Sequence, residues 1–366
     1  MKKQQIESIY FLRLFAMMMV VLVHVTAAYA SVLPYSGDAY QKYHFINRII
    51  RIEAGIFIVI TGLVFFYSYI KKPLTKELWK SYYKRRVTYI LIPYIIWALI
   101  YEAYSIYVGA REFNATEILL RILKGESYYQ LHFIFLIVQI YLVLPVFIWI
   151  AQKFTFFRRY MWLFGVVLQL VYLQLNSMYG LVSFTLFISS LSTFLLGAWI
   201  GVYYNEQKAK SANKSTIVLL IIALIAGAIV SSLHYYVYTI KTLYLSGVMY
   251  ETINTFYLVL GSYVAFRIGE ILAAKLPRRA VITVRNIAMY SFGFYLIHPL
   301  VLNIVSEFVP ANSNQLFHIE MLIRYVLTLA LCYLIIWACH RFLPFASLLY
   351  GKLPKKAVFL YKHEVQ

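Results

Sequence analysis

The sequence is organised around a series of apolar stretches, each long enough to cross a lipid bilayer as a helix. A span needs about 20 mostly apolar residues, because the hydrocarbon core is about 30 Å thick and a helix rises about 1.5 Å per residue. Composition agrees, since 62% of the 366 residues are hydrophobic and only 13% are charged. Ten such stretches are predicted, at residues 9–30, 49–70, 87–109, 131–150, 160–175, 180–203, 216–237, 252–269, 286–306 and 319–340.

This pattern predicts an all-α fold, a polytopic membrane helical bundle of about ten transmembrane helices that forms a single domain over residues 1–366. Backbone polar groups in hydrocarbon must be satisfied internally, and a helix does this within its own segment. The fifth and sixth stretches are separated by little more than residues 173–180. This pair is therefore expected to be either two full spans or a re-entrant pair, and both keep the count even.

Lysine and arginine are distributed unevenly between alternate connecting segments. With the N-terminus placed in the cytoplasm, 25 of the 34 Lys and Arg residues belong to cytoplasmic segments and six to outer loops. The positive-inside rule then predicts that both termini are cytoplasmic, in a multi-pass protein of a bacterial-type plasma membrane. Basic loops that face anionic membrane lipid account for most of the net charge of +20, so no nucleic acid partner is expected.

The first apolar stretch also has features of a cleavable signal peptide, because two lysines precede it and Ala28-Tyr29-Ala30 ends it. Arg13 at its start and His24 within it argue against cleavage. We therefore expect this stretch to be a permanent membrane helix.

Arg13 and His24 are the most informative residues of this first stretch. They are eleven residues apart, which at 100° per residue places both on one helix face, about 16 Å apart along the axis. Ionisable groups are costly in hydrocarbon and usually face a protein interior or a wet cavity. The pair is therefore predicted to have a function.

Other ionisable residues are expected near the depth of His24. The ninth stretch contains His298 followed by Pro299, and the second opens with Arg51 and Glu53. Pro299 leaves the carbonyl group of Tyr295 without its helical partner, which is tolerated where a cavity or a neighbouring group can satisfy it. Glu53 is interpreted either as the structural ion-pair partner of an arginine or as a carboxylate that orients a histidine.

The chemistry of these residue types suggests a two-ended site. Histidine transfers protons near neutral pH, because its reference pKa is about 6.5. Arginine stays charged and binds phosphate or carboxylate groups through a forked set of donors. Together they suggest an anionic donor held from the cytoplasmic side, whose reactive end reaches a base deeper in the membrane.

Four motifs, in order along nearly the whole chain, resemble those of the acyltransferase family 3 membrane proteins. These are Arg13 and His24 with ten residues between them, the segment 51–62 ending in Thr61-Gly62, the basic run Lys84-Arg85-Arg86 followed by Pro93-Tyr94, and the segment 291–299 containing Tyr295-Leu-Ile-His298-Pro299. The resemblance implies transfer of an acyl group, acetyl or succinyl, from cytoplasmic acyl-CoA to a hydroxyl of a cell-surface or exported glycan.

The resemblance also suggests roles for individual residues. His24 would be a general base or a transient acyl carrier, Arg13 would hold the donor, and His298 and Glu53 would complete the catalytic group. No metal and no permanently bound cofactor are expected, and acyl-CoA is the donor substrate. The expected substrate-binding residues are Arg51, Arg85, Arg86, Tyr295, Ser291 and His132.

Two positions depart from the family pattern. Many members have a histidine two residues before an aromatic residue in the fourth span, where this chain has Gln130 or the shifted His132. A second arginine often found before the proline of the third span is Tyr89 here. Both departures leave the Arg13 and His24 pair unchanged.

Two questions about partners follow from the resemblance. Some members carry a fused extracellular hydrolase-like domain, and this chain is expected to act without one, either alone or with a partner from glycan synthesis or export. A rival class is a transporter or flippase for a polysaccharide or a lipid-linked intermediate, because intramembrane His and Arg residues also serve proton relays. Transporters often show inverted repeats with broken helices at matching places, and the sequence shows no such repeat.

Overall fold

The computed structural model describes residues 5–361, and this part of the chain consists of helices and loops without any strand. The α-helices are α1 (Ser8–Ala30), α2 (Asp38–Ile50), α3 (Ile52–Tyr69), α4 (Lys76–Arg86), α5 (Ile92–Tyr107), α6 (Ala115–Lys124), α7 (Leu131–Lys153), α8 (Thr155–Arg159), α9 (Met161–Tyr179), α10 (Leu191–Val202), α11 (Tyr204–Ser211), α12 (Ser215–His234), α13 (Gly247–Lys275), α14 (Arg278–Ala288), α15 (Ser291–Phe308), α16 (Phe317–Phe342) and α17 (Ala346–Tyr350). Short π-helical turns lie at Val87–Leu91 and Tyr235–Thr239, and a 3-10 turn lies at Phe187–Ser190.

The predicted polytopic bundle is confirmed. Within the described chain, nine helical segments are long and apolar enough to cross a membrane. A tenth crossing is formed if α10, with its preceding 3-10 turn, and α11 count as one span bent by 95°. The chain is thus a multi-pass membrane protein of nine or ten spans.

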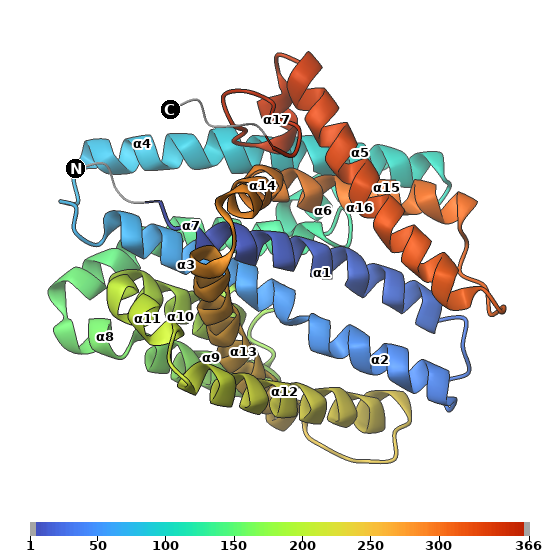
Figure 1. Ribbon diagram of the computed structural model, residues 1–366, viewed down its shortest axis with the longest axis horizontal. Coiled ribbons are helices and arrows are strands. Elements are labelled where there is room, and N and C mark those ends of the chain that lie inside the picture. The colour runs from blue at the N-terminus through green and yellow to red at the C-terminus, as the bar shows by residue number, and fades with distance from the viewer. Residues whose placement is uncertain (1–4, 362–366) are drawn as a thin grey trace.

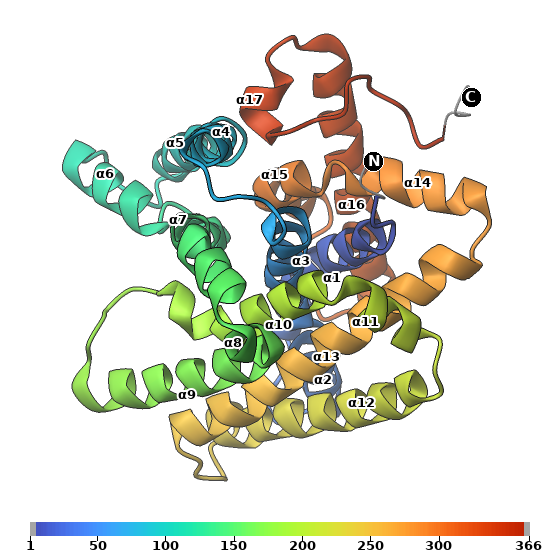
Figure 2. The same cartoon turned by 90° about the vertical axis from the view of Figure 1, so that its left-hand side faces the viewer.

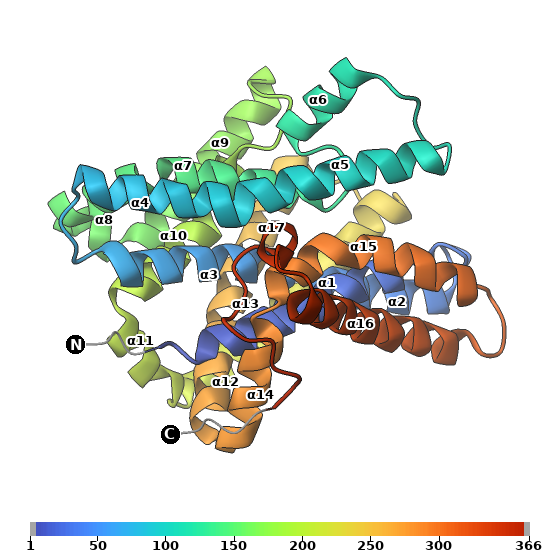
Figure 3. The same ribbon diagram turned by 90° about the horizontal axis from the view of Figure 1, so that it is seen from above.

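Helix α1 lies at the centre of the bundle. In Figure 1 it runs from left to right, with α4 and α5 above it and α12 below it. Figure 2, a view along the bundle, places α1 and α3 in the middle and the paired helices α12 and α13 on one side. Seen from above, α4 and α5 form one long run that crosses the molecule (Figure 3). We call the end where α1 begins the basic end, because the Lys-rich and Arg-rich tract 71–86 starts there, and the opposite end the far end.

The sixth predicted span differs from the expectation of a uniform helix over 180–203. Gly180, with φ +59°, ends α9, and a regular helix resumes only at Leu191. From Leu191 to Gly201 almost every side chain of α10 is buried, because the helix packs against α3, α9 and α13. This short helix therefore lies inside the bundle rather than facing lipid.

Glycines bring the backbones of α3 and α10 into direct contact. Gly197 and Gly201 form a G-x-x-x-G pair on α10, and Gly62 faces them from α3. A Cβ atom at Gly197 would lie 2.1 Å from the carbonyl oxygen of Val59, so no side chain fits there. Small residues of this kind let membrane helices associate closely, since van der Waals packing drives their contact.

Gly197→Ala is expected to destabilise the bundle by about 1–3 kcal/mol or more, because the added methyl group must displace backbone atoms of α3. The measurement is the apparent melting temperature of the purified protein in detergent. Gly247→Ala is the matched control, since no atom from elsewhere in residues 5–361 lies within 4 Å of its Cβ position. Equal melting temperatures for the two variants would contradict the tight α3–α10 contact.

Two predicted spans are interrupted where site residues lie. The second span breaks at Arg51, whose ψ of 0° separates α2 from α3. The ninth, predicted as continuous over 286–306, breaks at Met289 and Tyr290, between α14 and α15. Neither position carries proline or glycine, so the sequence gives no local signal for a break.

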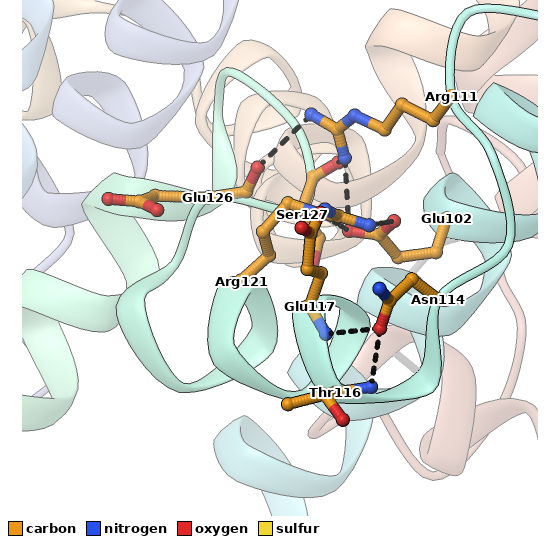
Figure 4. Close-up of polar contacts among 8 residues, drawn as sticks. All are labelled: Glu102, Arg111, Asn114, Thr116, Glu117, Arg121, Glu126 and Ser127. Carbon is orange, nitrogen blue, oxygen red and sulfur yellow. Dashed lines mark hydrogen bonds and ion pairs between the residues drawn. The ribbon is translucent and has the colours of Figure 1, made fainter.

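An ion cluster at the far end holds α5 and α6 together (Figure 4). Glu102, whose side chain is 2% exposed, pairs with Arg111 at 3.0 Å and with Arg121 at 2.8 Å. The hydrogen bond from Arg121 to this carboxylate raises the pKa of Arg121 above its usual value. The Asn114 side chain accepts hydrogen bonds from two backbone N–H groups and caps α6. Two of the six basic residues assigned to outer loops are thus neutralised by a buried acid.

Candidate active site

Arg13 faces a cavity of about 350 Å³, which we call the basic chamber. Its polar lining comes from α1, α3, α4, the Val87–Leu91 turn, α7, α15 and the segment after α17. The lining includes four cationic residues and no acidic residue, and these cations are Arg13, Arg85, Arg86 and Lys352. A cavity with this charge is suited to an anionic ligand.

The guanidinium groups of the basic chamber are held in different ways. Arg86 lies over three rings, 4.5 Å from the centroid of Phe65, 5.0 Å from that of Tyr82 and 4.9 Å from that of Tyr141. Arg85 donates to the Ser81 hydroxyl at 2.8 Å. Arg13 forms no ion pair with any described residue. Because cation–π contacts orient a charge without neutralising it, the chamber keeps its positive potential.

His24 lines a second cavity of about 160 Å³, which we call the histidine chamber. It lies farther along α1 than the basic chamber, as the predicted axial separation of Arg13 and His24 requires. The other polar residues that line it are Arg51, Glu53, Tyr129, Gln130, His132 and Tyr295.

The structure brings the two predicted histidines together. The ring centroids of His24 and His298 are 5.5 Å apart, with an interplanar angle of 25°. The centroid of the His24 ring also lies 4.6 Å from that of the Tyr129 ring. His298 is 1% exposed, whereas His24 is partly exposed and borders the cavity. Of the two imidazoles, His24 is therefore the one that a ligand in the histidine chamber can reach.

Pro299 determines the protonation pattern of His298. Because proline has no N–H, the carbonyl of Tyr295 lacks its helical donor. The Nδ1 atom of His298 lies 3.0 Å from this carbonyl oxygen and 3.1 Å from that of Phe294. Carbonyl oxygens only accept, so the neutral ring carries its proton on Nδ1, and the lone pair of the buried Nε2 has no hydrogen-bond partner among the described residues. This assignment follows from the hydrogen-bond partners.

Three aromatic rings separate the two chambers. Phe57, Phe133 and Tyr295 each line both cavities, and their ring centroids are 5.5–6.1 Å apart. The Tyr295 hydroxyl donates to the Gln130 carbonyl at 2.5 Å, which fixes its ring. We call these three residues the aromatic constriction. They form the boundary that the two chambers share.

The structure does not form the ion pair considered for Glu53. Glu53 is 9% exposed, and its Oε2 has no hydrogen-bond partner among the described residues. Arg51 instead donates to the Asn47 side chain at 3.2 Å. The carboxylate therefore remains available to groups inside the histidine chamber.

The remaining predicted site residues are divided between the chambers. Ser291 lies on the basic chamber and Tyr295 on both. Gln130 and His132 were the two candidates for the place of the family's fourth-span histidine. Both side chains line the histidine chamber, so the structure does not choose between them by position alone. His132 is exposed and bonds through Nδ1 to the Tyr129 carbonyl at 2.6 Å, whereas Gln130 is 3% exposed. Gln130 is thus the more enclosed of the two.

Several lining residues were not predicted from the sequence. Lys352 reaches the basic chamber because the chain after α17 folds back on the Val87–Leu91 turn. At this point Gly351 has φ +72°, and a Cβ atom there would lie 2.5 Å from the Tyr89 carbonyl oxygen. Only glycine fits that approach. Gly351 could have indicated a close backbone approach, but the sequence does not show which segment it approaches, because Tyr89 is more than 200 residues away in the chain.

The fold and the two chambers define a helical membrane protein with a cavity lined by four cations and, farther along α1, a cavity lined by His24 beside the buried His298. Comparison with known proteins identifies the family, because the acyltransferase domain family matches residues 6–337. The chain belongs to this family and is a membrane acyltransferase. The family predicted from the four motifs is therefore confirmed.

Curated relatives come from several strains of Staphylococcus aureus, among them Mu50 and NCTC 8325. Each is named as a probable poly-beta-1,6-N-acetyl-D-glucosamine export protein and is 24% identical over 320 residues, covering 83% of this chain and 84% of the relative. No solved structure matches the chain.

Pro299→Ala is expected to lower the maximal acyl-transfer rate by roughly 10-fold or more, within the range that acid–base catalysis contributes. The new N–H would bond to the Tyr295 carbonyl and release Nδ1 of His298 from its fixed pattern. The measurement is the rate in membranes at saturating donor. Pro145→Ala is the control, because the carbonyl four residues before it accepts from the Tyr82 hydroxyl and not from a histidine. Equal maximal rates in the two variants would contradict this role of Pro299.

Proposed function

We propose that the protein transfers an acyl group, acetyl or succinyl, from cytoplasmic acyl-CoA to a hydroxyl of a cell-surface or exported glycan. The observation that carries the proposal is the pair of chambers on one helix. One is lined by four cations and no acid, and the other is lined by His24, whose ring stacks on that of the buried His298. The basic chamber suits the phosphates of CoA, and the histidine chamber suits the acceptor hydroxyl.

The donor enters, in this proposal, from the basic end of the bundle, which faces the cytoplasm. The positive-inside rule supports this orientation, because the tract 71–86 begins there. Arg13, Arg86 and Lys352 bind the phosphates, since arginine and lysine are the usual ligands of such groups. The narrow pantetheine arm passes the aromatic constriction by moving its rings apart, so the thioester reaches His24 while the phosphates stay behind.

His24 acts as the general base in this reaction. Its imidazole takes the proton of the acceptor hydroxyl as the oxygen bonds to the thioester carbonyl carbon. The carbon–sulfur bond then breaks, and the CoA thiolate leaves and takes the proton back from the imidazolium. Glu53, with an unpartnered oxygen in the same chamber, stabilises the transient positive charge on His24. His298 supports the ring of His24 through their 5.5 Å stacking.

The acceptor class is supported by the relatives. Their name refers to a polymer of N-acetylglucosamine, which offers many hydroxyl groups. The same name refers to export, so a transporter or flippase for a polysaccharide or lipid-linked intermediate is the second candidate. The aromatic constriction favours transfer over transport, because a sugar chain is far wider than a pantetheine arm. Proteins of glycan synthesis or export are the expected partners in either case.

His24→Ala is expected to abolish acyl esters on the surface glycan, because it removes the imidazole that lines the histidine chamber and stacks on the His298 ring. Esters are measured by mass spectrometry of the extracted glycan, with immunoblotting of membranes to show normal accumulation of the variant. Wild-type ester levels in this variant would refute the assignment. Intact glycan export without esters would separate transfer from transport.

Arg13→Ala and Arg86→Ala are expected to raise the acyl-CoA concentration needed for half-maximal transfer by roughly 10-fold each, since a charge-assisted contact contributes about 1.5–3 kcal/mol. The assay uses membranes and labelled acetyl-CoA or succinyl-CoA, which also identifies the acyl group. Lys208→Ala on α11 is the control, because it is basic and does not line the chamber. An unchanged donor requirement in both arginine variants would rule out the phosphate-binding role.

A further inference from the structure

A third polar cavity, of about 270 Å³, lies beside the histidine chamber between α2, α12 and α13. We call it the arginine pocket, because Arg48 and Arg51 both line it. Arg51 lines the histidine chamber as well, so the two cavities are neighbours. The mechanism proposed above uses none of the other residues of this pocket.

The charges of the arginine pocket do not balance. Arg48 and Arg51 form no ion pair with a described residue, and the one acidic residue in the lining is Glu251, which accepts a hydrogen bond from Asn254 at 3.2 Å. His234 also lines the pocket, and its buried Nδ1 has no hydrogen-bond partner within the described part of the chain. The pocket thus has two positive guanidinium groups and one negative carboxylate. This excess of positive charge suits an oxyanion, most of all a phosphate, which arginine binds through paired donors.

An apolar groove of about 230 Å³ adjoins the pocket on the side of the basic end. Tyr257 lines both cavities, and its hydroxyl donates to the Ile49 carbonyl at 2.6 Å. Residues of the α2–α3 junction line both cavities. Arg48 and Arg51 line the arginine pocket, whereas Ile49, Ile50 and Ile52 line the apolar groove. Along α13 the groove extends from Tyr257 to Leu272, about 22 Å by helical rise.

We propose that the arginine pocket and the apolar groove together bind a lipid phosphate, and that this lipid carries the glycan acceptor. The phosphate lies between Arg48 and Arg51, and the hydrocarbon chain lies in the groove, which is longer than the roughly 15 Å of one leaflet. The first sugar then extends past Arg51 into the histidine chamber, and the exposed ring of Tyr238 offers a stacking face beside the pocket. The inference rests on the proposed function for the identity of the cargo.

The test measures lipid binding separately from transfer. Purified full-length protein in detergent is titrated with decaprenyl phosphate, and occupancy is read by native mass spectrometry. Arg48→Gln and Arg51→Gln are each expected to weaken binding about 10-fold, because each removes one charged partner of the phosphate. Inorganic phosphate is expected to bind at least about 10-fold more weakly than decaprenyl phosphate, since it gains nothing from the groove.

Two neighbouring positions on α12 provide a matched pair for the groove. Leu224 and Ile225 are both 55% exposed, but only Leu224 lines the groove. Leu224→Gln should weaken binding of decaprenyl phosphate several-fold, and Ile225→Gln should leave it unchanged. Equal binding by these two variants, or inorganic phosphate bound as tightly as the lipid, would overturn the site. Phosphatidylglycerol bound as tightly as decaprenyl phosphate would overturn the assignment to an acceptor carrier.

The two proposals fail in distinguishable ways. His24→Ala should keep full binding of decaprenyl phosphate while losing ester formation. If Arg48→Gln binds the lipid and forms esters like the wild type, the lipid site is refuted and the acyl transfer stands. If His24→Ala still forms esters, the transfer mechanism is refuted. The lipid site is then still tested, because lipid binding by Arg48→Gln and Arg51→Gln is measured independently of ester formation.

Discussion

A charged side chain inside a membrane is tolerated only where the protein builds a polar environment around it, and this requirement shapes the centre of the bundle. Arg13 and His24 lie on one face of α1, so α1 needs cavities along that face instead of lipid. Helices α3, α7 and α15 line both the basic chamber around Arg13 and the histidine chamber around His24. The glycine contact between α3 and α10 anchors the wall that carries Phe57 and Glu53.

Prolines contribute in a related way, because each one inside a helix frees a carbonyl that must find a donor. At Pro299 the donor is the Nδ1–H of His298, and at Pro145 it is the hydroxyl of Tyr82. The first of these fixes the imidazole beside His24, and the second holds α4, with Arg86 next to the same tyrosine, against α7. The irregularities of the helices therefore position site groups at both chambers.

Much of this could be predicted from the sequence, because it depends on local periodicity. The spans follow from the length of apolar stretches, and the shared face of Arg13 and His24 follows from helical geometry. The meeting of His24 with His298 could be expected from their similar depth. Other features could not be predicted, because they depend on contacts between distant segments. The rings around Arg86 come from three helices, Lys352 arrives through a fold-back, and the break at Arg51 has no proline or glycine to mark it.

The aromatic constriction has a consequence for the cell as well as for the reaction. A continuous wet channel from one membrane face to the other would dissipate the proton gradient, which every bacterial-type plasma membrane must maintain. Phe57, Phe133 and Tyr295 contact one another at the boundary between the two chambers, and in the proposed reaction a long thin thioester arm parts them without admitting bulk solvent. If the proposed transfer operates, the same three rings limit the flow of ions through the bundle while the acyl group crosses it.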